Sequence, residues 1–132
     1  MRDEIAIRKM IDHAERVIAY CEGYSYEEFL ADTRTIEASV FNISQIGELA
    51  HLLEKTYGEQ FPNVPWHDMY GVRCRIIHDY DGVNFALVWQ IIRNDLPKLI
   101  KGLNEILKKL LLIGDDSHAR CVGIFRVQGN GA

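Results

Sequence analysis

The segment DTRTIEASVFNISQIGELAHLLEKT, residues 32–56, decides the fold class of this chain. Apolar or small residues recur along it every three or four positions, which is the period of an amphipathic helix. One face carries Ile36, Val40, Ile43, Gly47 and Ala50. Further apolar residues widen that face, namely Phe41, Ile46, Leu49, Leu52 and Leu53. A helix with so wide an apolar surface is expected to lie at the centre of a helical domain.

The segments before this central helix also show a helical period. Residues 7–21 place apolar side chains on one face, and Gly23 is a plausible stop after them. Ser25 and Glu28 then have the spacing of a capping box, in which side chain and backbone cap each other at a helix start. The sequence therefore predicts a long first helix and a short second one.

The segments after the central helix predict two more helices. Pro65 is suited to the first position of a fourth helix, and Asn84 can cap a last one. The last helix is expected to be a single long helix kinked at Pro97. From residue 113 the period stops, so 113–132 is expected to be a poorly structured tail or a short extended segment. The prediction is an all-α, four- to five-helix up-and-down bundle spanning residues 1–112.

Composition limits the classes of function. The 132 residues are 48% hydrophobic and 26% charged, with a net charge of −4, so bulk positive charge cannot hold nucleic acid. No apolar run has the length of a membrane span. Its three cysteines, Cys21, Cys74 and Cys121, lie far apart without a C-x-x-C pair, which fits a reducing compartment. A cytoplasmic protein without membrane association is therefore expected.

The stretch YGVRCRIIHDYDG, residues 70–82, carries the chemistry. Arg73 occupies an otherwise apolar side of the fourth predicted helix, where an unpaired guanidinium would be costly. The structural explanation is an arginine that extends its guanidinium to solvent, or one paired with a core carboxylate such as Glu48. The functional explanation is an anion site, because the guanidinium fork matches phosphate geometry.

His78 and Tyr80 follow Arg73 by five and seven residues. On an ideal helix His78 lies about 140° from Arg73, so one regular helix does not focus both on one point. They can converge if the helix end distorts. They can also converge if a second copy packs against the small-residue side made by Gly71, Cys74 and His78, which would place two arginines and two histidines around one cleft.

Arg73, His78 and Tyr80 match the signature R-x-x-x-x-H-x-Y, and several flanking segments strengthen the match. These segments are YSYEEFLAD, NISQIGELA, VPW and DYDGVNFALVWQIIRNDLPKL. In these residues the chain resembles the HEPN superfamily, specifically the HepT-like group of small bacterial and archaeal ribonuclease toxins. The resemblance covers residue 1 to about residue 112.

This resemblance implies a homodimer with the motif at the interface, acting as a metal-independent endoribonuclease without a cofactor. Arg73 would stabilise the phosphate and transition state, and His78 would be the general base or acid. The chain would be the toxin of a type VII-like toxin–antitoxin system. Its partner would be a minimal nucleotidyltransferase antitoxin that neutralises it by transferring AMP to Tyr80.

The chain departs from the family pattern at Cys74, where a polar residue, most often asparagine, usually follows the motif arginine. Because cysteine is a weak hydrogen-bonding group, a non-catalytic HEPN module that binds nucleotide or a partner is the alternative. A metal-dependent HD phosphohydrolase would need further histidines and an aspartate in a pattern that the sequence lacks. The accessory candidates are Glu48, Cys74, Arg75, Asp79 and Arg93.

Overall fold

The computed structural model describes residues 2–78 and 84–112, and all regular elements within these ranges are helical. They are α1 (Arg2–Tyr20), α2 (Tyr26–Leu30), α3 (Thr33–Tyr57), α4 (Trp66–His78), α5 (Phe85–Gln90), the π-helical turn η2 (Ile91–Asp95) and an α-helical stretch over 96–112. The predicted all-α bundle with a long last helix is confirmed.

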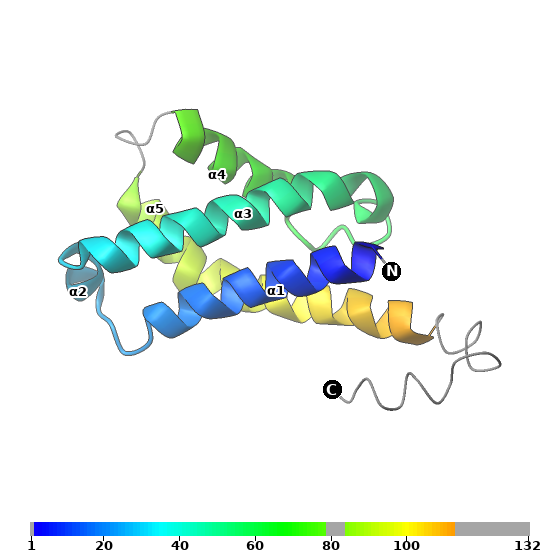
Figure 1. Ribbon diagram of the computed structural model, residues 1–132, viewed down its shortest axis with the longest axis horizontal. Coiled ribbons are helices and arrows are strands. Elements are labelled where there is room, and N and C mark those ends of the chain that lie inside the picture. Colours follow the sequence, from blue (N-terminus) through cyan, green and yellow to red (C-terminus); the bar gives the residue numbers. More distant parts are fainter. Residues whose placement is uncertain (1, 79–83, 113–132) are drawn as a thin grey trace.

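Helix α3 occupies the central position that its sequence predicts. It packs against α1 along one side and against α4 along another, and Figure 1 shows it running between these two helices. The last helix crosses behind α1 and α3 in this view. The wide apolar surface of α3 lets it contact two neighbouring helices at once, which explains its central position.

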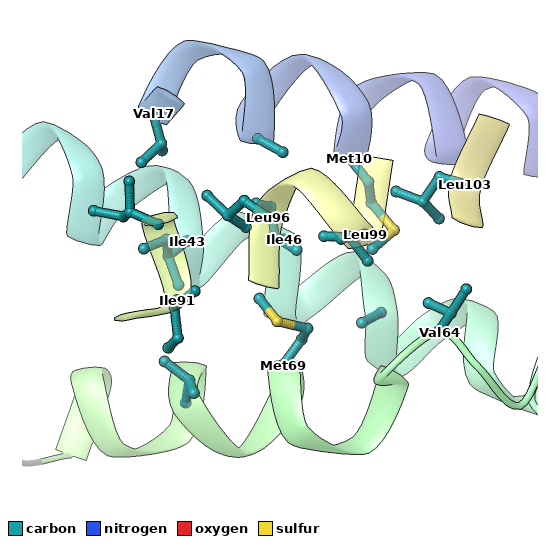
Figure 2. Packing of buried hydrophobic residues seen from close by; sticks show 14 of the residues in the cluster. Met10, Val17, Ile43, Ile46, Val64, Met69, Ile91, Leu96, Leu99 and Leu103 are labelled. Carbon is teal, nitrogen blue, oxygen red and sulfur yellow. The ribbon is translucent and has the colours of Figure 1, made fainter. Parts of the chain in front are cut away.

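The core forms where α1, α3, α4 and the last helix meet. Figure 2 shows Met10 and Val17 from α1, Ile43 and Ile46 from α3, and Met69 from α4 surrounding side chains of the last helix. All five are among the buried residues of one hydrophobic cluster. The interior also contains a polar side chain of α3 that has a hydrogen-bond partner. Asn42 is 4% exposed, and its Oδ1 is hydrogen-bonded to Nδ1 of His13 at 2.7 Å.

The predicted width of the α3 core face is correct for some residues and wrong for two. Ile46 and Leu53 are buried, and Leu49 is partly buried against the core. Phe41 and Leu52, however, are 59% and 61% exposed. Neighbours cover α3 on the α1 and α4 sides, and these two residues lie on the side that remains open.

Three predicted helix boundaries are confirmed by local geometry. The Ser25 side chain accepts a hydrogen bond from the Glu28 amide at 3.1 Å, and the Glu28 carboxylate accepts one from the Ser25 amide at 2.8 Å. Asn84 caps α5 through the Leu87 amide. Gly23 follows α1 with a φ of +78°, a backbone conformation that favours glycine.

The last helix is continuous from Phe85 to residue 112, as predicted, but its irregularity lies before Pro97. In η2 the helix widens, so that the amide of Leu96 donates to the carbonyl of Ile91, five residues back. Proline has no N–H and its ring crowds the carbonyl four residues earlier, here that of Arg93. A π-helical turn at this place relieves that conflict without breaking the helix.

The predicted tail, 113–132, lies outside the described residues. Within the described ranges, no helix combines the length and the apolarity that crossing a lipid bilayer requires.

Candidate functional site

Helix α4 is fixed to the bundle by an apolar side that starts at its first residue. Trp66 is 3% exposed, and its Nε1 donates to the Phe61 carbonyl at 3.0 Å. Met69, Val72 and Ile76 continue the buried side. The sequence placed Arg73 on this side, and its Cβ does face Gly47 of α3, although its guanidinium reaches the partly exposed flank of the helix pair.

On this flank Arg73 is paired with Glu48 of α3. Nη2 of Arg73 lies 3.0 Å from Oε1 of Glu48, and the two side chains are 26% and 45% exposed. The carboxylate named as a structural partner from the sequence is therefore in contact with the guanidinium. Both groups still reach solvent, so an anion from outside can approach Arg73.

Gly47 determines how close α3 and α4 come at this point. A Cβ built on Gly47 would lie 2.4 Å from the Arg73 Cβ and 2.5 Å from the Met69 carbonyl oxygen. No other residue type fits without moving the helices apart. The sequence identified Gly47 only as a small member of the apolar face, and its role in placing Arg73 is apparent only from the structure.

Gly47→Ala is therefore expected to destabilise the fold by about 1–3 kcal/mol, as overpacking does. In an open helix the same change would stabilise by up to about 1 kcal/mol, because alanine is the better helix former. Gly71→Ala on α4 is the control when the chain is diluted to a monomer, since nothing in the same chain lies within 4 Å of the added carbon. Chemical denaturation of both variants at one protein concentration measures the difference. Equal stabilities would contradict this account of Gly47.

A second contact between α3 and α4 lies beside the ion pair. The ring of His51 stacks on that of Tyr70, with centroids 4.0 Å apart and planes 13° from parallel. The guanidinium carbon of Arg73 lies 5.9 Å from the centroid of the Tyr70 ring. A hydrogen bond to Cys74 raises the pKa of the Tyr70 hydroxyl above its usual value. Sequence patterns gave no functional signal for His51 or Tyr70.

The remaining motif residues are only partly described. His78 is the last residue of α4, so the helix is continuous from Arg73 to His78, and the predicted separation around the helix applies to the backbone positions. Asp79 and Tyr80 lie outside the described residues.

Two accessory arginines lie at different places. Arg75 is exposed on α4, two residues beyond Arg73. The guanidinium carbon of Arg93 lies 5.5 Å from the centroid of Trp89, which packs against Phe29 of α2. Arg93 is therefore placed at the junction of α2 and α5, and the structure shows no contact between it and Arg73.

In residues 2–78 and 84–112, no set of three or more His, Cys, Asp or Glu side chains converges as metal ligands would.

Comparison with known proteins gives the family. The model of the family described as "Ribonuclease HepT-like" matches residues 10–106, which is most of the chain. This chain belongs to the HepT-like ribonuclease family. The matched range includes α3 with Gly47, the motif helix α4 and most of the last helix.

Named relatives of this HepT-like chain come from bacteria and archaea. A protein named "Putative RNase" from Caldanaerobacter subterraneus subsp. tengcongensis is 34% identical over 103 residues, which are 78% of this chain and 92% of the relative. A "Probable ribonuclease HepT" from Thermococcus cleftensis is 33% identical over 95 residues, covering 72% and 86%. A second "Putative RNase", from Methanocaldococcus jannaschii, is 31% identical over 101 residues, covering 76% and 84%. No solved structure matches this HepT-like chain.

Proposed function

We propose that this HepT-like chain is a metal-independent endoribonuclease that acts as the toxin of a toxin–antitoxin pair. The observation that carries the proposal is the placement of Arg73. Arg73 is on the same helix as His78. Its guanidinium is partly exposed and pairs with Glu48 of α3, 3.0 Å away. Membership of a ribonuclease family gives this anion site a substrate class.

The chemistry needs few groups, because RNA carries its own nucleophile. The 2′-hydroxyl attacks the adjacent phosphorus, the P–O5′ bond breaks, and the 5′-oxygen leaves with a proton. His78 accepts the proton of the 2′-hydroxyl or supplies one to the leaving oxygen. Arg73 stabilises the charge that develops on the phosphorane. A phosphate replaces Glu48 as the partner of Arg73 when RNA binds.

A homodimer would bring the motif helices of two copies together. Phe41, Glu48 and Leu52 are spaced by seven and four residues, so they share the open side of α3. Phe41 and Leu52 are the exposed apolar residues on either side of the Arg73 partner. On α4, Gly71 faces open space and Cys74 is half-exposed. We call these five residues the α3–α4 face.

The α3–α4 face suits a second copy because its apolar residues and small residues surround the ion pair. Large apolar side chains left in water mark interaction sites, and small residues let helices approach closely. Pairing two such faces about a two-fold axis would place the His78 of one copy near the Arg73 of the other. The separation of these residues around α4 would then no longer prevent a joint site.

The proposed partner is a nucleotidyltransferase antitoxin that transfers AMP to the hydroxyl of Tyr80. Tyr80 follows His78 by two residues, so the modification would add bulk and negative charge beside the motif. RNA would then be excluded by sterics and by repulsion between phosphates. The signature is a peptide containing Tyr80 that is heavier by whole AMP units.

A non-catalytic HEPN module is the second candidate, and Cys74 favours it. This side chain stands where the family usually has a stronger hydrogen-bonding group. A module of this kind would keep the Arg73–Glu48 pair for binding nucleotide or partner and would not cleave RNA.

The purified chain is expected to cleave RNA in excess EDTA, leaving 2′,3′-cyclic phosphate and 5′-hydroxyl ends. These ends follow from attack by the 2′-hydroxyl. Electrophoresis of labelled RNAs of several sequences, with end analysis by mass spectrometry, tests it. The same reaction with Mg²⁺ in place of EDTA is the control and should give the same products. Absence of cleavage on all RNAs would favour the binding module, and cleavage only with Mg²⁺ would exclude the proposed mechanism.

A further inference from the structure

The His51–Tyr70 stack is a surface feature and contributes little to the core. Neither ring belongs to the buried hydrophobic cluster, and His51 is exposed while Tyr70 is half-buried. The α3–α4 contact is already fixed nearby by the close approach at Gly47 and by buried Met69. The stack therefore needs another explanation than the stability of the bundle.

The stack is continuous with the anion site. The Tyr70 ring contacts both His51, at 4.0 Å between centroids, and the Arg73 guanidinium, whose carbon lies 5.9 Å from the Tyr70 centroid. The Arg73 guanidinium, the Tyr70 ring and the exposed His51 imidazole are thus neighbours, next to Glu48. Among the described residues, no ring other than Tyr70 packs on His51.

Single-stranded nucleic acid binds to this combination of groups. Proteins that hold it pair a cation for the backbone with an aromatic ring on which a base stacks, since every base has a π face. RNA is read in particular through unstacked bases that lie on Phe, Tyr, Trp or His. The exposed His51 ring packs on Tyr70, which in turn contacts Arg73. A base next to a phosphate bound by Arg73 would therefore lie near His51.

We propose that His51, supported from behind by Tyr70, is a nucleobase-binding residue for single-stranded RNA. A base of a nucleotide next to the phosphate on Arg73 stacks on the exposed face of the imidazole. Tyr70 acts as a positioning residue, because it holds the His51 ring and lies against Arg73. The inference rests on the proposed function, since RNA must be the ligand of the Arg73 site.

The test measures RNA binding apart from cleavage. In a His78→Ala background, a fluorescently labelled single-stranded RNA is titrated by anisotropy with and without His51→Ala. Loss of one base stack is expected to weaken binding about five- to a hundredfold. His51→Phe keeps a stacking ring and should restore most of the affinity. His67→Ala, which removes an exposed histidine at the start of α4, is the matched control and should bind like the background.

Three results would overturn the inference. The first is an unchanged RNA affinity in His51→Ala, and the second is a loss of affinity that His51→Phe does not restore. The third is a change from dimer to monomer in His51→Ala, which would make His51 a contact between copies. Cleavage of the same RNA by the wild-type chain is measured in parallel. Cleavage with unchanged His51→Ala affinity rejects this inference alone. Absence of both cleavage and binding in the wild type rejects the proposed function and this inference with it.

Discussion

Arg73→Ala is expected to lower the rate of RNA cleavage by at least about a hundredfold. Removing one preorganised charge-stabilising group from a transition state typically costs a factor of about 10²–10³. Arg73→Lys keeps the charge but not the planar fork, so it should recover only part of the rate. Single-turnover cleavage of a labelled RNA measures both variants.

The loss in Arg73→Ala should come from chemistry, because the variant is expected to fold. The Arg73–Glu48 pair is partly exposed, and such a pair contributes at most about 1 kcal/mol to stability. Arg16→Ala on α1 is the matched control: it removes the same charge from an exposed pair with Asp12 and should cleave at the wild-type rate. Wild-type cleavage by Arg73→Ala would remove Arg73 from the mechanism. His78→Ala should lose activity to a similar extent.

If the proposed homodimer forms, the double variant Phe41→Asp, Leu52→Asp is expected to convert it to a monomer and to abolish cleavage. Burying a large apolar side chain contributes about 1.5–3 kcal/mol, and each copy would lose two such contributions at the α3–α4 face. Both residues are more than half exposed in the monomer, so the bundle itself should keep its stability. Sedimentation velocity and RNA cleavage on the same samples measure the two effects.

The control for the double variant is Ile5→Asp. Ile5 is 51% exposed on α1, away from the α3–α4 face, and an acidic residue in the first turns suits the helix dipole. This variant should remain a dimer and remain active. A double variant that stays dimeric would contradict the proposed interface. A monomer that cleaves RNA at the wild-type rate would contradict a site shared between two copies.

Helical periodicity predicted most of the fold. Helix boundaries followed from capping chemistry at Ser25 and Asn84, which acts locally and can be read from a few neighbouring residues. The exposure of Phe41 and Leu52 could not be read in this way. Periodicity shows that a residue is apolar and shares a face, but the number of neighbours around a helix decides whether that face is covered.

The candidate site was predicted in its parts but not in its arrangement. The signature around Arg73 and the partner Glu48 were available from the sequence, whereas the close approach of α3 and α4 that brings the two together was not. Gly47 and His51 carry no local signal of their own, because their importance arises from what lies opposite them on α4. Contacts of this kind depend on how two helices pack, which single-chain patterns do not specify.

The pairing of Glu48 with Arg73 also has a consequence for the ionic-strength dependence of RNA binding. An arginine that is free before binding neutralises a phosphate outright, and the counterions released from the RNA make affinity fall steeply with salt. In the proposed site the phosphate would displace a carboxylate, and the freed Glu48 would attract cations of its own. Arg73 should therefore contribute to affinity while adding less to the salt slope than an unpaired surface arginine would.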